Sequence, residues 1–184
     1  MAKNGGRRPD RKMKPLILVL CEGQTEECYV NMLKQKYRIP IRIVSKIVGQ
    51  KINQGLIDRY KEELKISRAE NIECFLMYDA DIKKIVDNLL SCEATVLLSN
   101  PCIEVWFLAH TQRVPQNEIS TDQCLALLRN KENWSGYSKG SLTESQKSIL
   151  WKNKSIAKNN VEDEIRDNAT FSTVGVFIER LEQG

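Results

Sequence analysis

The sequence predicts an α/β fold: a roughly four-stranded, mainly parallel sheet flanked by helices, with a C-terminal helical extension. Apolar runs of strand length alternate four times with amphipathic segments of helix length. The first run, residues 16–20, is continuously apolar, which is typical of a strand buried on both faces of a parallel sheet. Repeated strand–helix order favours right-handed crossovers with helices on both faces of that sheet.

The first strand is expected at residues 14–21. Gly23 allows a tight turn after it, and Thr25 can cap the helix that follows. That helix is expected to reach about Tyr37, because apolar side chains recur at helical spacing as far as that residue. Pro40 prevents its continuation.

The middle of the chain continues the alternation. A weaker strand is expected at residues 41–48, and a charged amphipathic helix at residues 54–70. An apolar strand at residues 72–78, a short helix at residues 82–91 and a fourth strand at residues 94–98 follow.

A further helix is expected to open at Asn100 and Pro101 and to end near His110. Proline is favoured at the first helical position behind an asparagine cap. Beyond residue 120 the whole pattern is helical. His110 shares one side of its helix with apolar residues, which favours a place at the edge of the core over a metal ligand.

Composition fits one domain with a small appendage. Of 184 residues, 41% are hydrophobic, which is enough for an ordinary core. Residues 1–13 are expected to form a disordered basic tail, residues 14–112 an α/β core, and residues 113–184 a helical extension packed on that core. No apolar segment approaches the length of a membrane span, and no secretory signal pattern is present.

The six cysteines form no CxxC pair, and one histidine accompanies them. This usage argues against a zinc site and favours buried free thiols in a reducing compartment. A cytoplasmic protein without membrane association is therefore expected.

A second basic stretch lies inside the chain, at residues 129–158. It holds seven basic and two acidic residues, together with Trp134, Tyr137 and Trp151. Basic side chains interleaved with aromatic ones suit a polyanion whose bases can stack, such as DNA or RNA. A helix pair with a solvated basic face explains the same pattern, and the sequence leaves both readings open.

Acidic residues follow two of the predicted strands. Glu22 comes directly after the first strand, and Asp79 and Asp81 follow the third. The carboxyl ends of parallel strands meet at one edge of a sheet, where ligands of such folds gather. In an extended chain, the i, i+2 spacing also turns both aspartates to one side. We therefore expect the three carboxylates to lie close together.

These segments resemble the RloB-like proteins, a branch of the TOPRIM superfamily found beside bacterial restriction and abortive-infection genes. The resemblance covers about residues 14 to 182. The residues that carry it are Glu22-Gly23-x-Thr25-Glu26 with Tyr29, Asp79-x-Asp81, the run from Ser99 through Asn100, Pro101 and Glu104 to His110, Tyr137-x-Lys139-Gly140, and Asn168-Ala169-Thr170-x-Ser172-Thr173 followed by Phe177, Ile178 and Leu181.

The resemblance implies a TOPRIM-like core and metal-dependent phosphodiester chemistry. Carried over by motif, Glu22, Asp79 and Asp81 would bind Mg²⁺ or Mn²⁺. Hard cations of this kind prefer oxygen ligands and keep several waters. The chain departs from the family pattern where Ile82 and Lys83 replace a further acidic residue, which puts a second metal in doubt. The implied activity is a nuclease that cleaves DNA or RNA in anti-phage defence.

Two more residues are expected to assist catalysis. Glu104 lies near the start of its helix at the same sheet edge, where it can serve a water or a second metal; a carboxylate favoured by the helix dipole is the simpler explanation. Lys139 can place a cation on the scissile phosphate, unless it is merely exposed in a basic loop. The residues expected to contact substrate are Gly23, Thr25, Asn100 and Tyr137.

Other functions remain open at this stage. The same fold can serve as a non-catalytic or partner-dependent nucleic-acid-binding subunit that works with an ATPase. Haloacid-dehalogenase-type phosphatases place DxD after the first strand, whereas here it ends the third. Receiver domains need a lysine after a fifth strand that the pattern does not provide. The sequence does not decide between DNA and RNA, one metal and two, or a monomer and a homo-oligomer.

Overall fold

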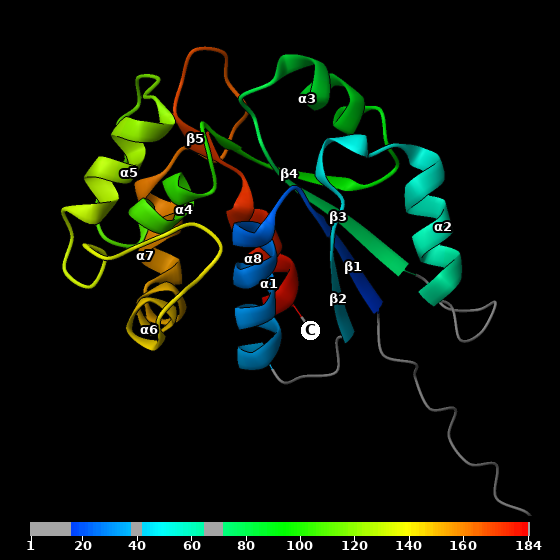
Figure 1. Ribbon diagram of the computed structural model, residues 1–184, viewed down its shortest axis with the longest axis horizontal. Helices are drawn as coiled ribbons and strands as arrows, with labels where there is room; N and C mark the ends of the chain where they lie inside the picture. The colour runs from blue at the N-terminus through cyan, green and yellow to red at the C-terminus, as the bar shows by residue number, and fades with distance from the viewer. Residues whose placement is uncertain (1–15, 38–41, 65–71, 184) are drawn as a thin grey trace, which may run out of the picture.

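The computed structural model describes residues 16–37, 42–64 and 72–183. Within these ranges the strands form a five-stranded sheet in the order β2-β1-β3-β4-β5, with helices on both faces (Figure 1). The predicted α/β class with a mainly parallel sheet is therefore confirmed. The tail expected at residues 1–13 lies outside the described residues.

The four parallel strands are β1 (Leu16–Cys21), β2 (Arg42–Ile47), β3 (Ile72–Asp79) and β4 (Thr95–Asn100). Every residue of β1 is at most 1% exposed, because β1 lies between β2 and β3 and both of its faces are covered. This burial explains the unbroken apolar run. The same strand order puts the carboxyl end of β1 beside that of β3.

Two groups of helices cover the two faces of the sheet (Figure 1). The larger core, on one face, includes residues of α1 (Gln24–Tyr37), α4 (Glu104–Ala109), α5 (Thr121–Arg129), α6 (Glu144–Lys152), α7 (Lys154–Asn160) and α8 (Val174–Glu182). The smaller core, on the other face, includes residues of α2 (Gln54–Leu64) and α3 (Lys83–Leu90), near a 3₁₀ turn, η1 (Gly49–Lys51).

The C-terminal segment differs from the expected all-helical extension, because it also contributes a strand. β5 (Phe171–Ser172) pairs antiparallel with the end of β4. The hydroxyls of Ser99 and Ser172 lie 2.8 Å apart in this pairing, and Thr173 Oγ1 accepts a hydrogen bond from Leu98 N. A two-residue strand is too short to produce an alternating pattern, so its sequence does not distinguish it from a loop.

The prediction of a helix start at Asn100 is wrong. β4 continues through Asn100, the Asn100–Pro101 peptide is cis, and α4 begins only at Glu104. Asn100 Nδ2 donates to Ala169 O at 2.7 Å instead of capping a helix. The helix expected at residues 54–70 is described as α2 up to Leu64, and the rest of that prediction falls on residues outside the described ranges.

Among the described helices, none combines the length and apolar character needed to cross a membrane.

His110 closes the C-terminal end of α4 inside the protein. It is 1% exposed, its Nδ1 lies 2.8 Å from Trp106 O, and its ring meets the Trp106 ring edge-on at 4.9 Å. Burial lowers the pKa of His110 from 6.5 to about 4. The folded protein therefore holds a neutral imidazole at pH values where the unfolded chain already binds a proton.

The free energy of unfolding should consequently be lower at acid pH. The contribution of His110 is complete above pH 6.5 and is lost as the pH falls toward 4, by up to about 3 kcal/mol. Denaturant titrations of the wild type and His110→Gln across this range measure the effect. The difference between the two proteins isolates the histidine from carboxylates that titrate in the same range. Parallel pH profiles would contradict the prediction.

Candidate functional site

The ends of β1 and β3 bring together two of the expected acidic residues. Glu22 N donates to Met77 O at 3.1 Å, which continues the pairing of β1 with β3. Glu22 Oε2 in turn accepts a hydrogen bond from Asp79 N at 3.1 Å. Asp79 Oδ1 accepts one from Ile103 N at 3.0 Å, in the turn before α4. Residues far apart in the chain thus meet at the carboxyl edge of the sheet.

Asp79 occupies a strongly unfavourable place for a negative charge. Burial is the largest cause that raises its pKa from 3.8 to about 8. The carboxylates of Glu26, Glu104 and Glu22 act in the same direction, in that order. Lys139 lowers this pKa but does not compensate. At neutral pH the group therefore favours its protonated form when no cation is present.

Glu26 is a member of this cluster that the sequence analysis did not select as a site residue. Its Oε2 accepts a hydrogen bond from Gly23 N at 3.0 Å, and the side chain is only 5% exposed. Burial raises its pKa, and the charges of Glu104 and Glu22 add to the rise. A Cβ on Gly23 would lie 3.3 Å from Glu26 Oε2, so the glycine permits this close approach.

Glu104 lies at the start of α4 and is fully buried. Its Oε1 accepts a hydrogen bond from the Tyr137 hydroxyl at 2.8 Å. Within the described part of the chain its Oε2 accepts no hydrogen bond, and Lys139 Nζ lies 3.6 Å from it. A buried carboxylate oxygen without a hydrogen bond is costly, which points to a role beyond helix capping.

Tyr137 and Lys139 belong to the loop between α5 and α6, and that loop is fixed to α1. Gly140 N donates to Thr25 Oγ1 at 3.0 Å. Gly140 has φ +81°, and a Cβ there would lie 3.1 Å from Gln24 Oε1, so both conformation and space require glycine. Burial lowers the pKa of Lys139 and the Glu104 charge raises it, with a net rise that keeps the ammonium charged.

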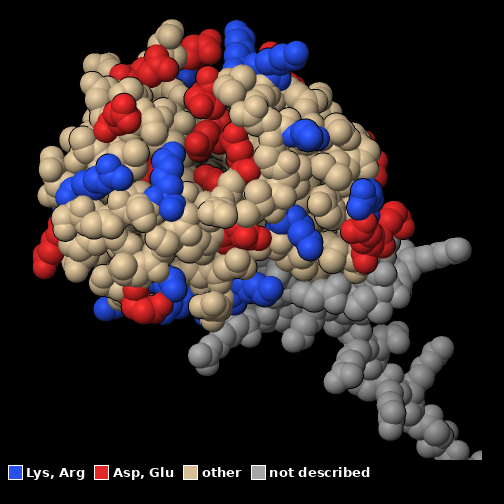
Figure 2. All heavy atoms as spheres, in the orientation of Figure 1, with Lys and Arg blue, Asp and Glu red and all other residues tan. Residues whose placement is uncertain are grey.

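These groups surround an open pocket of about 340 Å³. Figure 2 shows Asp and Glu side chains gathered around a hollow on this face of the molecule. The pocket is lined by Glu22, Gly23, Gln24, Thr25, Glu26, Asp79, Lys139 and Gly140. Of the expected substrate contacts, Gly23 and Thr25 therefore line it, Tyr137 supports Glu104 behind it, and Asn100 binds the backbone of Ala169.

Asp81 does not join the cluster. β3 ends at Asp79, and Ala80 N donates to Ser99 O at 2.9 Å before the chain bends. The alternation that would turn Asp81 to the side of Asp79 therefore stops, and Asp81 is exposed outside the pocket lining. Of the three expected carboxylates, Glu22 and Asp79 therefore lie together, with Glu26 and Glu104 beside them.

The aromatic residues of the internal basic stretch are mainly structural. Trp134 and Tyr137 are at most 3% exposed, so neither offers a face to a base. Trp151 is partly buried and lies under Lys154, whose Nζ is 3.8 Å from the ring centroid. Lys154 also forms an ion pair with Glu182 at 3.0 Å. The base-stacking reading of this stretch is not supported by these positions.

The comparison with protein families decides the relationship. A family model described as RloB-like protein matches residues 17–181. The chain belongs to the RloB-like family. No curated protein and no solved structure matches it. The matched residues include every carboxylate of the cluster. They also include the loop that carries Lys139 in this RloB-like protein.

The donor atoms of the pocket are carboxylate oxygens, the type of ligand that a hard divalent cation prefers. Within residues 16–37, 42–64 and 72–183, no three His, Cys, Asp or Glu side chains are placed as a ready metal cage. Mg²⁺ commonly uses one or two protein carboxylates and completes its shell with waters and phosphate oxygens. Glu22 and Asp79 can supply that pair, and Glu104 Oε2 is a further oxygen without a hydrogen bond.

Proposed function

We propose that this RloB-like protein is a divalent-metal-dependent nuclease that hydrolyses phosphodiester bonds in DNA or RNA, on a TOPRIM-like core. The observation that carries the proposal is the cluster of Asp79 with three neighbouring carboxylates, three of the four lining an open pocket that also contains a lysine. The resemblance to proteins encoded beside restriction and abortive-infection genes supports a role in anti-phage defence.

The electrostatics of the pocket favour a bound cation. Four carboxylates share a partly buried site with one opposing lysine; burial first, and then the charges of Glu26, Glu104 and Glu22, raise the pKa of Asp79 to about 8. Strongly shifted pKa values in a pocket are typical of functional sites, where burial and like charges are arranged for binding or catalysis. A doubly charged cation would convert the repulsion into attraction.

Each residue has a distinct part in the proposed reaction. Glu22 and Asp79 would hold Mg²⁺ or Mn²⁺, which when bound polarises a phosphoryl oxygen and acidifies a water. Glu104 lies behind the pocket; its Oε2, 3.6 Å from Lys139 Nζ, would orient that lysine, while the hydrogen bond from Tyr137 keeps Oε1 in place. Lys139 Nζ can donate to a non-bridging phosphate oxygen, where negative charge develops.

A second candidate function is a nucleic-acid-binding or regulatory subunit that depends on an ATPase partner. It is favoured by the missing three-residue metal cage in the described ranges and by the position of Asp81 outside the pocket. In that case the carboxylate cluster would be completed, or used, only within a larger assembly.

Metal-dependent cleavage by the isolated chain tests the proposal. Labelled single-stranded DNA, duplex DNA and RNA are incubated with the purified protein and Mn²⁺ or Mg²⁺, with EDTA as the control. The nuclease is expected to cleave at least one substrate only when metal is present. Mn²⁺ binding by calorimetry provides a readout that does not depend on cleavage. Metal binding without cleavage of any substrate would favour the partner-dependent subunit, and absence of both would reject a metal centre in the isolated chain.

A further inference from the structure

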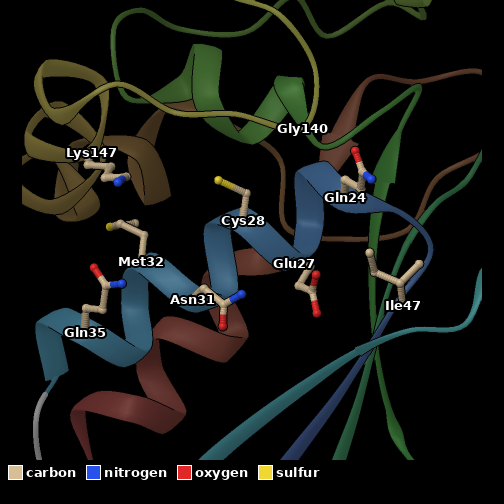
Figure 3. A pocket seen from close by; sticks show the side chains of 9 residues that line it. All are labelled: Gln24, Glu27, Cys28, Asn31, Met32, Gln35, Ile47, Gly140 and Lys147. Atoms are coloured by element: carbon tan, nitrogen blue, oxygen red, sulfur yellow. The ribbon is translucent and has the colours of Figure 1, made fainter.

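A second depression runs along α1 beside the carboxylate pocket. This α1 groove has a volume of about 500 Å³ and follows the helix from Gln24 to Gln35. Ile47 of β2 lines one side, and Lys147 of α6 and Gly140 line another (Figure 3). Its length along three turns of helix gives room for more than one water or ion.

The α1 groove adjoins the carboxylate pocket. Gln24 and Gly140 line both depressions and lie against each other where the two meet. A polymer with its phosphate beside Glu22 and Asp79 would therefore reach the groove by crossing Gln24 and Gly140. The groove is the part of the surface that the next nucleotide would meet.

The lining of the α1 groove matches a nucleoside better than a phosphate. Gln24 and Gln35 present amides that can both donate and accept hydrogen bonds, as base edges require, while Asn31 Oδ1 already accepts from Ser45 Oγ at 3.2 Å. Ile47 adds apolar surface, because it is 43% exposed although its side chain is large and hydrophobic, whereas Met32 is buried below the groove. A base can pack its face on such side chains while amides bind its edge.

The charge of the groove argues against double-stranded substrates. Among the described residues that line it, Lys147 is the one cation and Glu27 the one carboxylate. Lys147 Nζ already lies 2.8 Å from Glu144 Oε1, and Glu27 Oε1 accepts from Ser45 Oγ at 3.4 Å. Duplex backbones are bound mainly by several cations on phosphates, whereas unpaired strands rely on contacts with the bases.

From this lining we infer that the α1 groove binds an unpaired nucleotide next to the scissile phosphate, so that the substrate is single-stranded DNA or RNA. The inference deepens the proposed function and rests on it. It assigns recognition to the amide-bearing face of α1, whereas the chemistry belongs to the carboxylate pocket. The sugar, ribose or deoxyribose, is left to the experiment.

Charge-matched substitutions on α1 and α6 test the inference. Gln35→Glu and Lys147→Gln each change the charge of the groove by −1, while Lys36→Gln makes the same change on α1 outside the groove. Anisotropy of labelled single-stranded DNA, single-stranded RNA and duplex is measured in EDTA, so that nothing is cleaved. The two groove variants should weaken single-strand binding about tenfold, and Lys36→Gln should change it by less than about twofold.

Equal weakening by all three variants, or tighter binding of duplex than of either single strand, would overturn the inference. In the cleavage assay the groove variants should raise KM and leave kcat unchanged, which separates recognition from chemistry. If the wild type cleaves nucleic acid but the groove variants bind single strands normally, the proposed role of the groove is wrong and the proposed nuclease activity stands. If only the groove variants lose single-strand binding and the wild type cleaves no substrate, the groove binds nucleic acid but the proposed nuclease activity is wrong.

A footprint on the native protein provides an independent measurement. Cys28 lines the groove and Cys92 lies beyond α3, and both are partly exposed free thiols. Single-stranded oligonucleotide should slow alkylation of Cys28 and leave that of Cys92 unchanged, as followed by peptide mass spectrometry. Equal rates at Cys28 with and without oligonucleotide would count against occupation of the groove.

Discussion

Replacing Asp79 by asparagine is expected to lower metal-dependent cleavage by more than about 100-fold, because even outer-shell partners of metal ligands contribute 10–100-fold. The fold should survive. Asparagine keeps an acceptor for Ile103 N, and it removes an acid whose ionisation burial and three neighbouring carboxylates disfavour. The free energy of unfolding without metal should therefore be unchanged or higher. Cleavage rates and urea titrations of the same preparation measure both effects.

Asp81→Asn is the matched control for this substitution. Asp81 has the same chemistry and lies two residues away, but it is exposed and outside the pocket lining. Its replacement should reduce cleavage by less than about threefold, as surface substitutions usually do little. Equal losses in both variants would show that the motif-derived set of Glu22, Asp79 and Asp81 assembles on metal binding. Full activity of Asp79→Asn would contradict the proposed metal site.

Trp106→Ala is expected to cause the largest loss of stability, about 3–5 kcal/mol. Trp106 is fully buried on α4, and its Nε1 donates to Tyr29 Oη of α1 at 2.7 Å. It also approaches Gly175 at the start of α8, where an added Cβ would lie 3.7 Å from the indole. One side chain thus joins three helices of the larger core. Urea denaturation followed by circular dichroism measures the change.

Trp151→Ala provides the comparison for Trp106→Ala. Trp151 is only partly buried and packs edge-on against Tyr37 at 4.9 Å, so its removal should cost about 1–2 kcal/mol. If Trp106→Ala is too unstable to purify, Trp106→Phe keeps most of the volume and leaves the Tyr29 hydroxyl without its donor. A cost for Trp106→Ala no larger than that for Trp151→Ala would contradict the assigned packing.

Much of the fold could be predicted because its signals are local. The buried run of β1, Gly23 in the following turn and the amphipathic α1 each carry their pattern within a few residues. Strand order is not local, yet the rule that parallel strands share a carboxyl edge was enough to expect Glu22 beside Asp79, and Glu22 Oε2 does accept from Asp79 N.

The differences arise where a residue's surroundings come from distant parts of the chain. Glu26 entered the sequence analysis only as part of the family motif, and the fold brings Glu22 and Glu104 of α4 close enough to raise its pKa. Asp81 was expected to face its neighbour because the strand was assumed to continue, but β3 ends at Asp79. β5 forms by pairing with β4, and two residues are too few to show a strand pattern in the sequence.

The bond from Gly140 N to Thr25 Oγ1 has a consequence for biosynthesis. The pocket draws Glu22 from an early part of the chain and Lys139 from a loop that is synthesised much later. Synthesis from the N-terminus therefore supplies the acidic residues of the pocket well before the lysine that faces them.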